Sequence, residues 1–304
     1  MKIDFAEHGG NANRKSDLRL RTVSGETQKL AEVMLSRPDF LAPVPCCSVT
    51  RESLRHGFDT DRARALGQHN ALRALLERHE VTCHFVPAVE NAPDLSFTRD
   101  VAVTTPWGLV ALNPALAHRR AEVDHLLAAA AAIDIHPVAR IETGTIEGGD
   151  VCIVRPGLVI IGCSGERTDA QGADALATLF RRFGWDALIY PFDAHFLHLD
   201  TFFCMLDSEV ALACVDVLDD WFLAALSGRG IRLLPVRYKE ARGLGCNILS
   251  LDGRTIVMAS GHDRVAREVE RAGFAIESAD ISEFTACGGG IHCLTMPLAR
   301  VGRP

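Results

Sequence analysis

The chain has 304 residues, of which 48% are hydrophobic and 23% charged, as in a globular protein with a substantial core. Its formal net charge of −7 disfavours a nucleic-acid partner and suits a cationic small molecule. No apolar run approaches the roughly 20 residues of a membrane helix, and residues 1–8 do not lead into a signal-peptide core. We therefore predict a cytoplasmic protein with no membrane partner, and leave open a homodimer.

Ten cysteines are present, but no pair has the CxxC spacing of a structural zinc site. Cys152, Cys163, Cys204 and Cys214 lie in apolar stretches that read as strands. Because no export signal is evident, we interpret most of the cysteines as buried thiols rather than disulfides.

Residues 1–42 are polar and irregular around one helix expected over residues 26–35, and we interpret them as an N-terminal extension. Residues 43–304 contain no Pro/Gly-rich linker and are predicted to form a single domain. Residues 43–50 would open its first unit, and a helix over 61–79 and a strand over 81–86 would follow.

A unit of about 50 residues then recurs, with an apolar strand, a tight turn and a second apolar strand. These hairpins cover residues 100–112, 150–161, 201–213 and 247–258. Helices are expected over 117–132, 170–183, 216–226 and 263–272, and short strands over 136–139, 187–190, 231–235 and 274–277. Strand, turn, strand, helix and strand, repeated about five times, predict an α/β propeller.

The chemically reactive residues fall at the start of these units. They are Asp100, then Glu147 and Asp150, then His198 and Asp200, and finally Cys293. In a ring of repeated units, equivalent positions converge on one axis. The register therefore predicts a single polar site to which all the units contribute.

Cys293 follows three glycines, Gly288 to Gly290, which allow close backbone approach or positive φ next to a thiol. This arrangement is typical of a presented nucleophile, and the alternative is a glycine-rich turn with a buried thiol. His198 and Asp200 are two residues apart and would share one face of a strand. Histidine is well suited to proton transfer near neutral pH.

Asp100, Glu147 and Asp150 add carboxylates at equivalent places in neighbouring units, and buried acids need a cation. His198, Asp200, Glu147, His292 and Cys293 could ligate zinc or iron, but no helical ligand spacing is present. We therefore predict neither a metal nor a cofactor.

A guanidinium fits a cysteine, a histidine and three acids, because carboxylates pair with it bidentately and hold its weakly electrophilic carbon against a strong nucleophile. The acids disfavour the thiolate by raising the pKa of the thiol, and a cationic substrate or protonated His198 reverses that effect. We therefore expect the substrate to assist the activation of Cys293.

The motifs Phe97-Thr-Arg-Asp100, Glu147-Gly-Gly-Asp150, His198-Leu-Asp200-Thr201 and Gly288-Gly-Gly-Ile-His-Cys293 resemble those of the guanidino-group-modifying, or pentein, superfamily. This superfamily includes arginine deiminase, dimethylarginine dimethylaminohydrolase, agmatine deiminase and the amidinotransferases. The resemblance covers roughly residues 43–304 and implies a five-bladed α/β propeller.

The resemblance implies that Cys293 forms a covalent amidino-thioether, that His198 protonates the leaving amine and activates water, and that Glu147 orients His198. It also implies that Asp100 and Asp200 clamp the guanidinium, with Asp150 as a further acid. Two stretches around Arg119 and Arg167 resemble segments of arginine deiminase that place arginines on the substrate carboxylate.

Three features depart from arginine deiminase. Asp94 stands where deiminases carry an asparagine, and Gly288 stands where they often carry a substrate-facing arginine. The chain also lacks room for their inserted helical domain. An added acid and a lost base favour a less anionic substrate or one with an additional amine, and make Asp94 a candidate substrate contact.

The leading hypothesis from the sequence is a cysteine hydrolase that converts arginine to citrulline and ammonia. The alternatives are hydrolysis of dimethylarginine, amidino transfer to an amine, and hydrolysis of citrulline or another ureido compound. A non-catalytic propeller that binds arginine is a different class, but it would not need Cys293 or His198.

Overall fold

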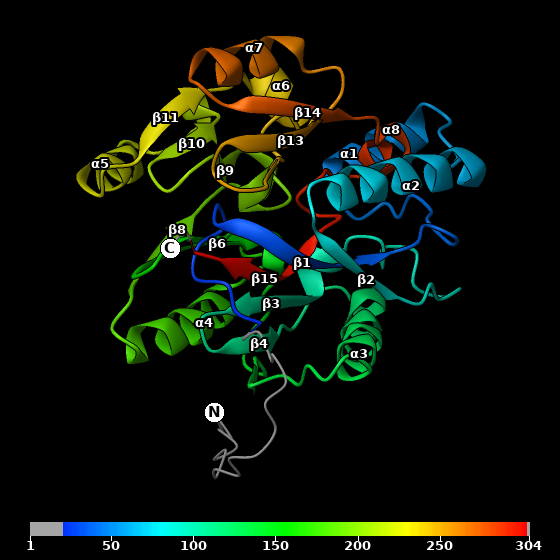
Figure 1. Ribbon diagram of the computed structural model, residues 1–304, viewed down its shortest axis with the longest axis horizontal. Coiled ribbons are helices and arrows are strands. Elements are labelled where there is room, and N and C mark those ends of the chain that lie inside the picture. The colour runs from blue at the N-terminus through cyan, green and yellow to red at the C-terminus, as the bar shows by residue number, and fades with distance from the viewer. Residues whose placement is uncertain (1–20, 303–304) are drawn as a thin grey trace.

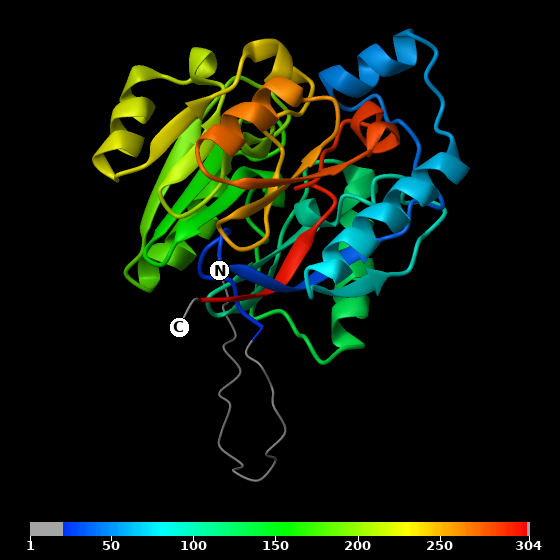
Figure 2. The same cartoon turned by 45° about the horizontal axis from the view of Figure 1, so that its top comes forward.

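The computed structural model describes residues 21–302 and contains five three-stranded sheets in a mixed α/β fold (Figures 1 and 2). The predicted α/β propeller is confirmed. The first unit has β3 (Ala102–Thr105), β4 (Gly108–Ala111), α3 (Ala117–Ala131) and β5 (Ala139–Arg140). The second has β6 (Val151–Arg155), β7 (Leu158–Cys163), α4 (Ala170–Arg182) and β8 (Asp186–Pro191).

The third unit has β9 (Phe203–Met205), β10 (Val210–Ala213), α5 (Asp220–Gly228) and β11 (Arg232–Pro235). The fourth has β12 (Leu249–Ser250), β13 (Thr255–Ala259), α7 (Asp263–Arg271) and β14 (Ala275–Ala279). In each unit the middle strand pairs antiparallel with the first strand and parallel with the last, because a helix carries the chain back.

The fifth unit joins the two ends of the chain. It consists of β15 (Met296–Val301), β1 (Lys29–Ser36), α2 (Arg62–Arg78) and β2 (Thr82–Val86). β1 lies between the other two strands, antiparallel to β15 and parallel to β2 (Figure 1). This pairing closes the series of sheets.

The helix expected over residues 26–35 is therefore wrong. Leu30, Val33 and Met34 have helical spacing, but backbone pairing on both sides and burial of this segment override the local pattern. Residues 29–36 thus belong to the fifth sheet, although they fall in the segment interpreted as an extension. Residues 1–20 of that segment lie outside the described residues.

The first strand of each unit lies on the inside, where β15 packs against β3, and β6 against β9. Short 3₁₀ turns precede three of these inner strands and pack against one another. They are η1 (Thr98–Val101), η2 (Gly148–Asp150) and η3 (Leu199–Thr201). The inner strands thereby bring the starts of the units together.

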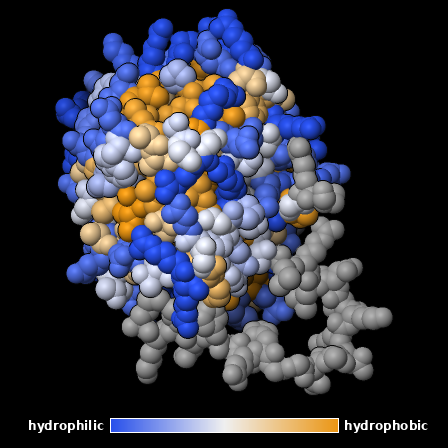
Figure 3. Space-filling model, turned by 90° about the vertical axis from the view of Figure 1, so that its left-hand side faces the viewer, coloured by the Kyte–Doolittle hydropathy of each residue, from blue (hydrophilic) through white to orange (hydrophobic). Residues whose placement is uncertain are grey.

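The remaining elements of residues 21–302 are three short helices and a 3₁₀ turn. They are α1 (Ser48–Arg55), α6 (Tyr238–Arg242), α8 (Ser282–Ala286) and the 3₁₀ turn η4 (Val215–Val217). One face of the molecule mixes apolar and polar patches (Figure 3). Among residues 21–302, no helix is long and apolar enough to cross a membrane. The homodimer stays a prediction.

All ten cysteines are free thiols. Cys152, Cys204 and Cys214 are buried, while Cys163 at the end of β7 is partly exposed. The interpretation of the strand cysteines as thiols rather than disulfides is therefore confirmed.

Candidate active site

The turns before the inner strands place the predicted residues in one buried cluster. Asp100 lies in η1, Asp150 in η2 directly after Glu147, and Asp200 in η3 directly after His198. Cys293 lies in the turn before β15. None of these side chains is more than 3% exposed.

His198 lies between two carboxylates. Its Nε2 is 2.8 Å from Glu147 Oε2, and its Nδ1 is 3.8 Å from Asp100 Oδ1. Burial disfavours the charged ring, but Asp100, Asp150 and Glu147 together raise the pKa of His198 to about 10. The imidazole is therefore protonated at neutral pH and can act as a general acid.

Glu147 connects His198 to Arg167. The same oxygen, Oε2, accepts a 2.9 Å bond from Arg167 Nη1. Burial works against ionisation of Glu147, but the bond to His198 and the charge of Arg167 lower its pKa to about 2. Glu147 therefore stays ionised and fixes the orientation of the imidazole, as its expected role requires.

Cys293 is a buried thiol beside an acid and an amide. Its Sγ lies 3.5 Å from Asp200 Oδ2 and accepts a 3.3 Å bond from Asn247 Nδ2. Burial and the charges of Asp200 and Asp100 raise the pKa of the thiol well above its usual value. In the free protein Cys293 is therefore neutral, as the acid-rich motifs indicate.

Each of the three glycines before Cys293 is required for its own steric reason. Gly288 has a φ of +92°, which side chains rarely adopt. A Cβ on Gly289 would lie 2.2 Å from the Phe97 ring, and one on Gly290 would lie 2.4 Å from Asn247 Oδ1. The glycines thus permit close packing of the turn against the first and fourth units.

Both carboxylate oxygens of the buried Asp150 accept hydrogen bonds from other protein groups. Oδ1 accepts a 2.8 Å bond from the backbone N–H of Leu199, and Oδ2 a 2.6 Å bond from Thr168 Oγ1. Burial raises the pKa of Asp150 to about 6. Because Leu199 lies between His198 and Asp200, we interpret Asp150 as a positioning residue rather than a substrate contact.

A small pocket leads to Cys293. Its walls comprise Cys46, Cys47, Asp94, Phe97, Asp100, Arg119, Arg167, Leu197, Cys287, Gly288 and Gly289. The three remaining sequence candidates, Asp94, Arg119 and Arg167, therefore all lie at this pocket. Asp94 Oδ2 is 2.8 Å from His118 Nε2, which comes from the start of α3.

The two arginines have different environments. Arg119 donates to Asp100 at 2.6 Å, to Glu122 at 2.9 Å and to the carbonyls of Asp94 and Phe97. Most of its donors are therefore occupied by the protein, and it holds Asp100 in place. Within the described part of the chain, Arg167 donates only to Glu147 and to the carbonyl of Cys46, and it is the better candidate for a substrate carboxylate.

Two site residues were not predicted from the sequence. Asn247 donates to Cys293 Sγ and accepts a 2.9 Å bond from the backbone N–H of His292, whose Nδ1 is 2.9 Å from Asp200 Oδ2. The repeat register could have identified Asn247, because it starts the fourth unit as Asp150 starts the second. The sequence indicated His292 only as a possible metal ligand, and no metal site was predicted.

Ligand atoms of Asp100, Glu147 and His198 lie within 4.8 Å of one another, as in a metal site. Without a metal, the acids around His198 raise its pKa to about 10, so its side chain is an imidazolium at neutral pH. The imidazolium itself thus supplies the positive charge between the two acids. That the protein needs no metal or cofactor stays a prediction.

Residues 48–300 match the family model described as N,N dimethylarginine dimethylhydrolase, eukaryotic. The chain belongs to this family. It is a pentein-superfamily hydrolase that acts on amidine C–N bonds, as the motifs indicate.

Relatives of the dimethylarginine hydrolase family span most of the chain. A dimethylarginine dimethylaminohydrolase of Pseudomonas aeruginosa is 26% identical over 239 residues, 78% of this chain and 89% of the relative. An arginine deiminase of Mycobacterium marinum is 28% identical over 253 residues, which cover 70% of this chain and 62% of the deiminase.

Solved structures share the fold. The dimethylarginine dimethylaminohydrolase of Pseudomonas aeruginosa in complex with citrulline has a TM-score of 0.73 at 22% identity, over 88% of this chain and 99% of the other. The N-terminal domain of an arginine dihydrolase from cyanobacteria has a TM-score of 0.78 at 19% identity, over 88% and 98%. The five ββαβ units of the chain are thus those of the pentein fold.

Proposed function

We propose that this chain hydrolyses the guanidino group of an arginine derivative through a covalent intermediate on Cys293. The observation that carries the proposal is the buried cluster of a thiol, an imidazolium and the carboxylates of Asp100 and Asp200 at the end of one pocket. Carboxylates are suited to hold a guanidinium, and the buried site excludes most water from the reacting carbon.

The first step begins when the guanidinium binds between Asp100 and Asp200. Its positive charge stabilises the thiolate of Cys293, and the thiol proton leaves to solvent. The sulfur then attacks the central guanidino carbon, and a C–S bond forms. As the C–N bond to the leaving amine breaks, protonated His198 donates its proton to the departing nitrogen.

The second step reverses these roles. Neutral His198 removes a proton from a water molecule, and the resulting hydroxide attacks the amidino carbon. The C–S bond breaks, the proton of the added hydroxyl group leaves to solvent, and the ureido product departs with the thiolate restored. Glu147 keeps His198 oriented throughout, because their 2.8 Å contact holds the ring.

We take dimethylarginine as the first substrate and free arginine as the second. The family match supports dimethylarginine, and so does the 89% coverage of a dimethylarginine dimethylaminohydrolase, against 62% for an arginine deiminase. Asp94 and Gly288, two of the three departures from deiminases noted in the sequence, both line the pocket. Arginine was the leading substrate in the sequence analysis, and the similarity to arginine deiminases still supports it.

The decisive experiment is a product assay on asymmetric dimethylarginine, arginine, agmatine, citrulline, and arginine with an amine acceptor. Wild type, Cys293→Ser and a control, Cys83→Ser in β2, are assayed in parallel. We expect citrulline with dimethylamine from dimethylarginine, or with ammonia from arginine, and a loss of several orders of magnitude in Cys293→Ser alone. Cys293-independent turnover, or none on the panel, would contradict the proposal.

Arg167 tests the orientation of the substrate. Arg167→Ala should raise KM for arginine roughly 10- to 100-fold, because a charge-assisted bond contributes about 1.5–3 kcal/mol. Agmatine, which lacks the carboxylate, should show only the smaller loss that follows from the loosened Glu147. Arg120→Ala is the control, since its side chain donates only to the carbonyls of Pro114 and Ala115. Equal losses on both substrates would reject the carboxylate role.

A further inference from the structure

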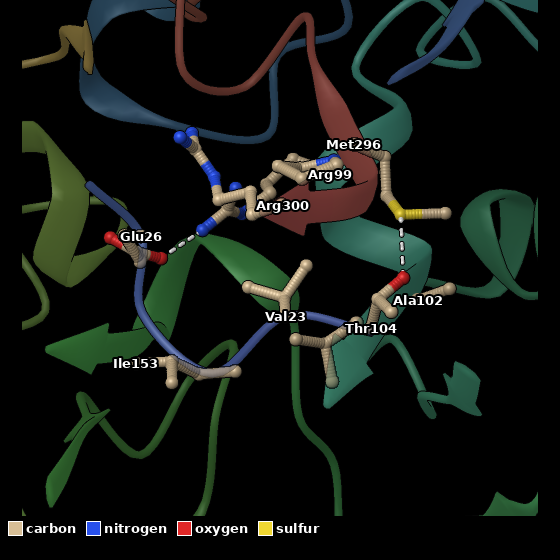
Figure 4. Close-up of a pocket in the computed structure, with 10 residues that line it drawn as sticks. Val23, Glu26, Arg99, Ala102, Thr104, Ile153, Met296 and Arg300 are labelled. Carbon is tan, nitrogen blue, oxygen red and sulfur yellow. Dashed lines mark hydrogen bonds and ion pairs between the residues drawn. The ribbon is translucent and has the colours of Figure 1, made fainter. Parts of the chain in front are cut away.

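A second pocket lies away from Cys293, among the inner strands β3, β6 and β15 and the segment before β1 (Figure 4). Much of its wall is apolar, from side chains such as Val23, Ile153 and Met296. Three charged side chains also line it: Glu26, Arg99 and Arg300. The proposed reaction uses none of these three residues.

Arg99 and Arg300 are both buried, with 4% and 6% of their surfaces exposed. Arg99 forms an ion pair with Glu26 (Figure 4). Arg300 donates through Nη1 to the carbonyls of Gln28, at 2.6 Å, and Ser250, at 2.8 Å. Among residues 21–302, the buried Nε atoms of both arginines have no hydrogen-bond partner.

Glu26 is also shared with His292, whose Nε2 lies 3.6 Å from Glu26 Oε2. When His292 is protonated, three cationic side chains face only the carboxylates of Glu26 and Asp200. Burial lowers the pKa of Arg300 to about 9, and although Glu26 opposes this effect, the charge of Arg99 adds to it. The buried cations Arg99, Arg300 and His292 thus share the carboxylates of Glu26 and Asp200, and a buried cation without close partners is costly.

We propose that this pocket binds a small monovalent inorganic anion such as chloride. The two Nε–H groups without a partner among residues 21–302 are the donors that such an anion would use, and its negative charge would offset part of the positive charge of the two arginines. The apolar wall offers little to a larger oxyanion, which needs more donors. Because Glu26 and Arg99 also neighbour His292, the anion would lie one layer behind the residues that hold Asp200.

The test is thermal unfolding of the full chain in sodium chloride or bromide against sodium gluconate at matched ionic strength, since gluconate is too large for the pocket. A ligand that binds only the folded state stabilises it by mass action. We expect a saturable rise in Tm of about 1–2 °C with chloride and bromide, which corresponds to about 1 kcal/mol in a protein of this size. Identical curves in chloride and gluconate would overturn the proposal and indicate that water fills the pocket.

Two variants with opposite expected effects locate the site. Arg300→Met removes a donor and one positive charge and should abolish the halide-specific rise, whereas Glu26→Gln removes the competing carboxylate and should lower the chloride concentration at half-saturation. Arg254→Met, at an exposed arginine, is the control and should leave the rise unchanged. A halide effect that persists in Arg300→Met would place it elsewhere and reject this pocket.

If the variants do not fold, crystals of the wild type grown in bromide decide the question. An anomalous peak beside the Nε atoms of Arg99 and Arg300 is expected. Its absence, with bromide bound only at the surface, would reject the site. The halide experiments do not involve the substrate. Their outcomes therefore do not test the proposed function, which the product assay tests separately.

Discussion

His198 and Cys293 do not form an ion pair in the free protein. The acids around His198 raise its pKa to about 10, while burial and neighbouring acids raise that of Cys293 well above its usual range. The resting site thus holds an imidazolium and a neutral thiol. A cationic substrate shifts this balance, because it adds the positive charge that a thiolate beside Asp200 needs.

The protonation of His198 contributes to stability with a definite pH dependence. Its pKa of about 10 in the folded protein lies above the ordinary value of 6.5. This contribution is therefore fully present below pH 6.5 and is lost as pH rises through about 10. The gap in unfolding free energy between wild type and His198→Asn should narrow over that window.

Chemical denaturation of both proteins at several pH values measures this gap. His136→Asn is the control, because that side chain is 71% exposed. A gap that stays constant from pH 6.5 to 10 would show that His198 is not charged in the folded protein.

His292 acts on the site through Asp200. Burial favours the protonated acid, but the 2.9 Å bond from His292 and its charge lower the pKa of Asp200. His292→Leu should therefore move the acid limb of the kcat/KM profile to higher pH and reduce kcat/KM at neutral pH about 10-fold or more. His292→Asn keeps an N–H donor and should restore part of the loss. An acid limb that does not move in His292→Leu would contradict this role.

Among elements, the turn before β15 is the one whose shape most directly controls the nucleophile. It packs so closely on Phe97 and Asn247 that Gly289 and Gly290 have no room for a Cβ. Asn247 in turn donates to Cys293 and accepts from the backbone of His292. The turn and the start of the fourth unit thus fix each other.

Gly290→Ala tests this fit. The new methyl group would lie 2.4 Å from Asn247 Oδ1, so Asn247 must move and its bond to the Cys293 sulfur weakens. We expect kcat to fall about 10-fold, which corresponds to about 1.4 kcal/mol in the barrier, with the fold retained.

Gly67→Ala is the matched control in the exposed part of α2, where a Cβ meets no atom within 4 Å. It should leave kcat unchanged and stabilise the protein by about 0.5–1 kcal/mol, because alanine favours a helix. Equal activity of the two variants would show that Asn247 tolerates the displacement.

At the scale of the whole molecule, the two ends of the chain complete one sheet. β15, which directly follows the Cys293 turn, pairs with β1, and β1 pairs with β2. Leu30, Val33 and Leu35 of β1 are buried in a cluster that also includes Cys293. The geometry of the nucleophile therefore depends on the N-terminal strand.

Leu35→Ala should lower the unfolding free energy by about 2–5 kcal/mol, because it leaves a cavity in this cluster. Leu54→Ala on α1, where the side chain is 37% exposed, should change it by no more than about 0.5 kcal/mol. Denaturant unfolding checks both values. Similar effects of the two substitutions would mean that β1 is not part of the stabilising core.

The sequence by itself determined the repeat, the α/β class and the nucleophile turn. Strand and helix periodicity is local, and glycines beside a thiol are visible without a structure. The register of the repeat also indicated that Asp100, Glu147, His198, Asp200 and Cys293 converge, because equivalent positions in a ring share one axis.

Only the tertiary structure decided which contacts each residue makes. The helix expected over residues 26–35 became a strand because β15 and β2, distant in sequence, pair with it. Asp150 and Arg119 proved to be bound mainly by other protein groups, and Asn247 joined the site, because hydrogen-bond partners depend on packing across units. Local sequence carries periodicity and residue chemistry, but burial and pairing between distant segments set the partners and the protonation states.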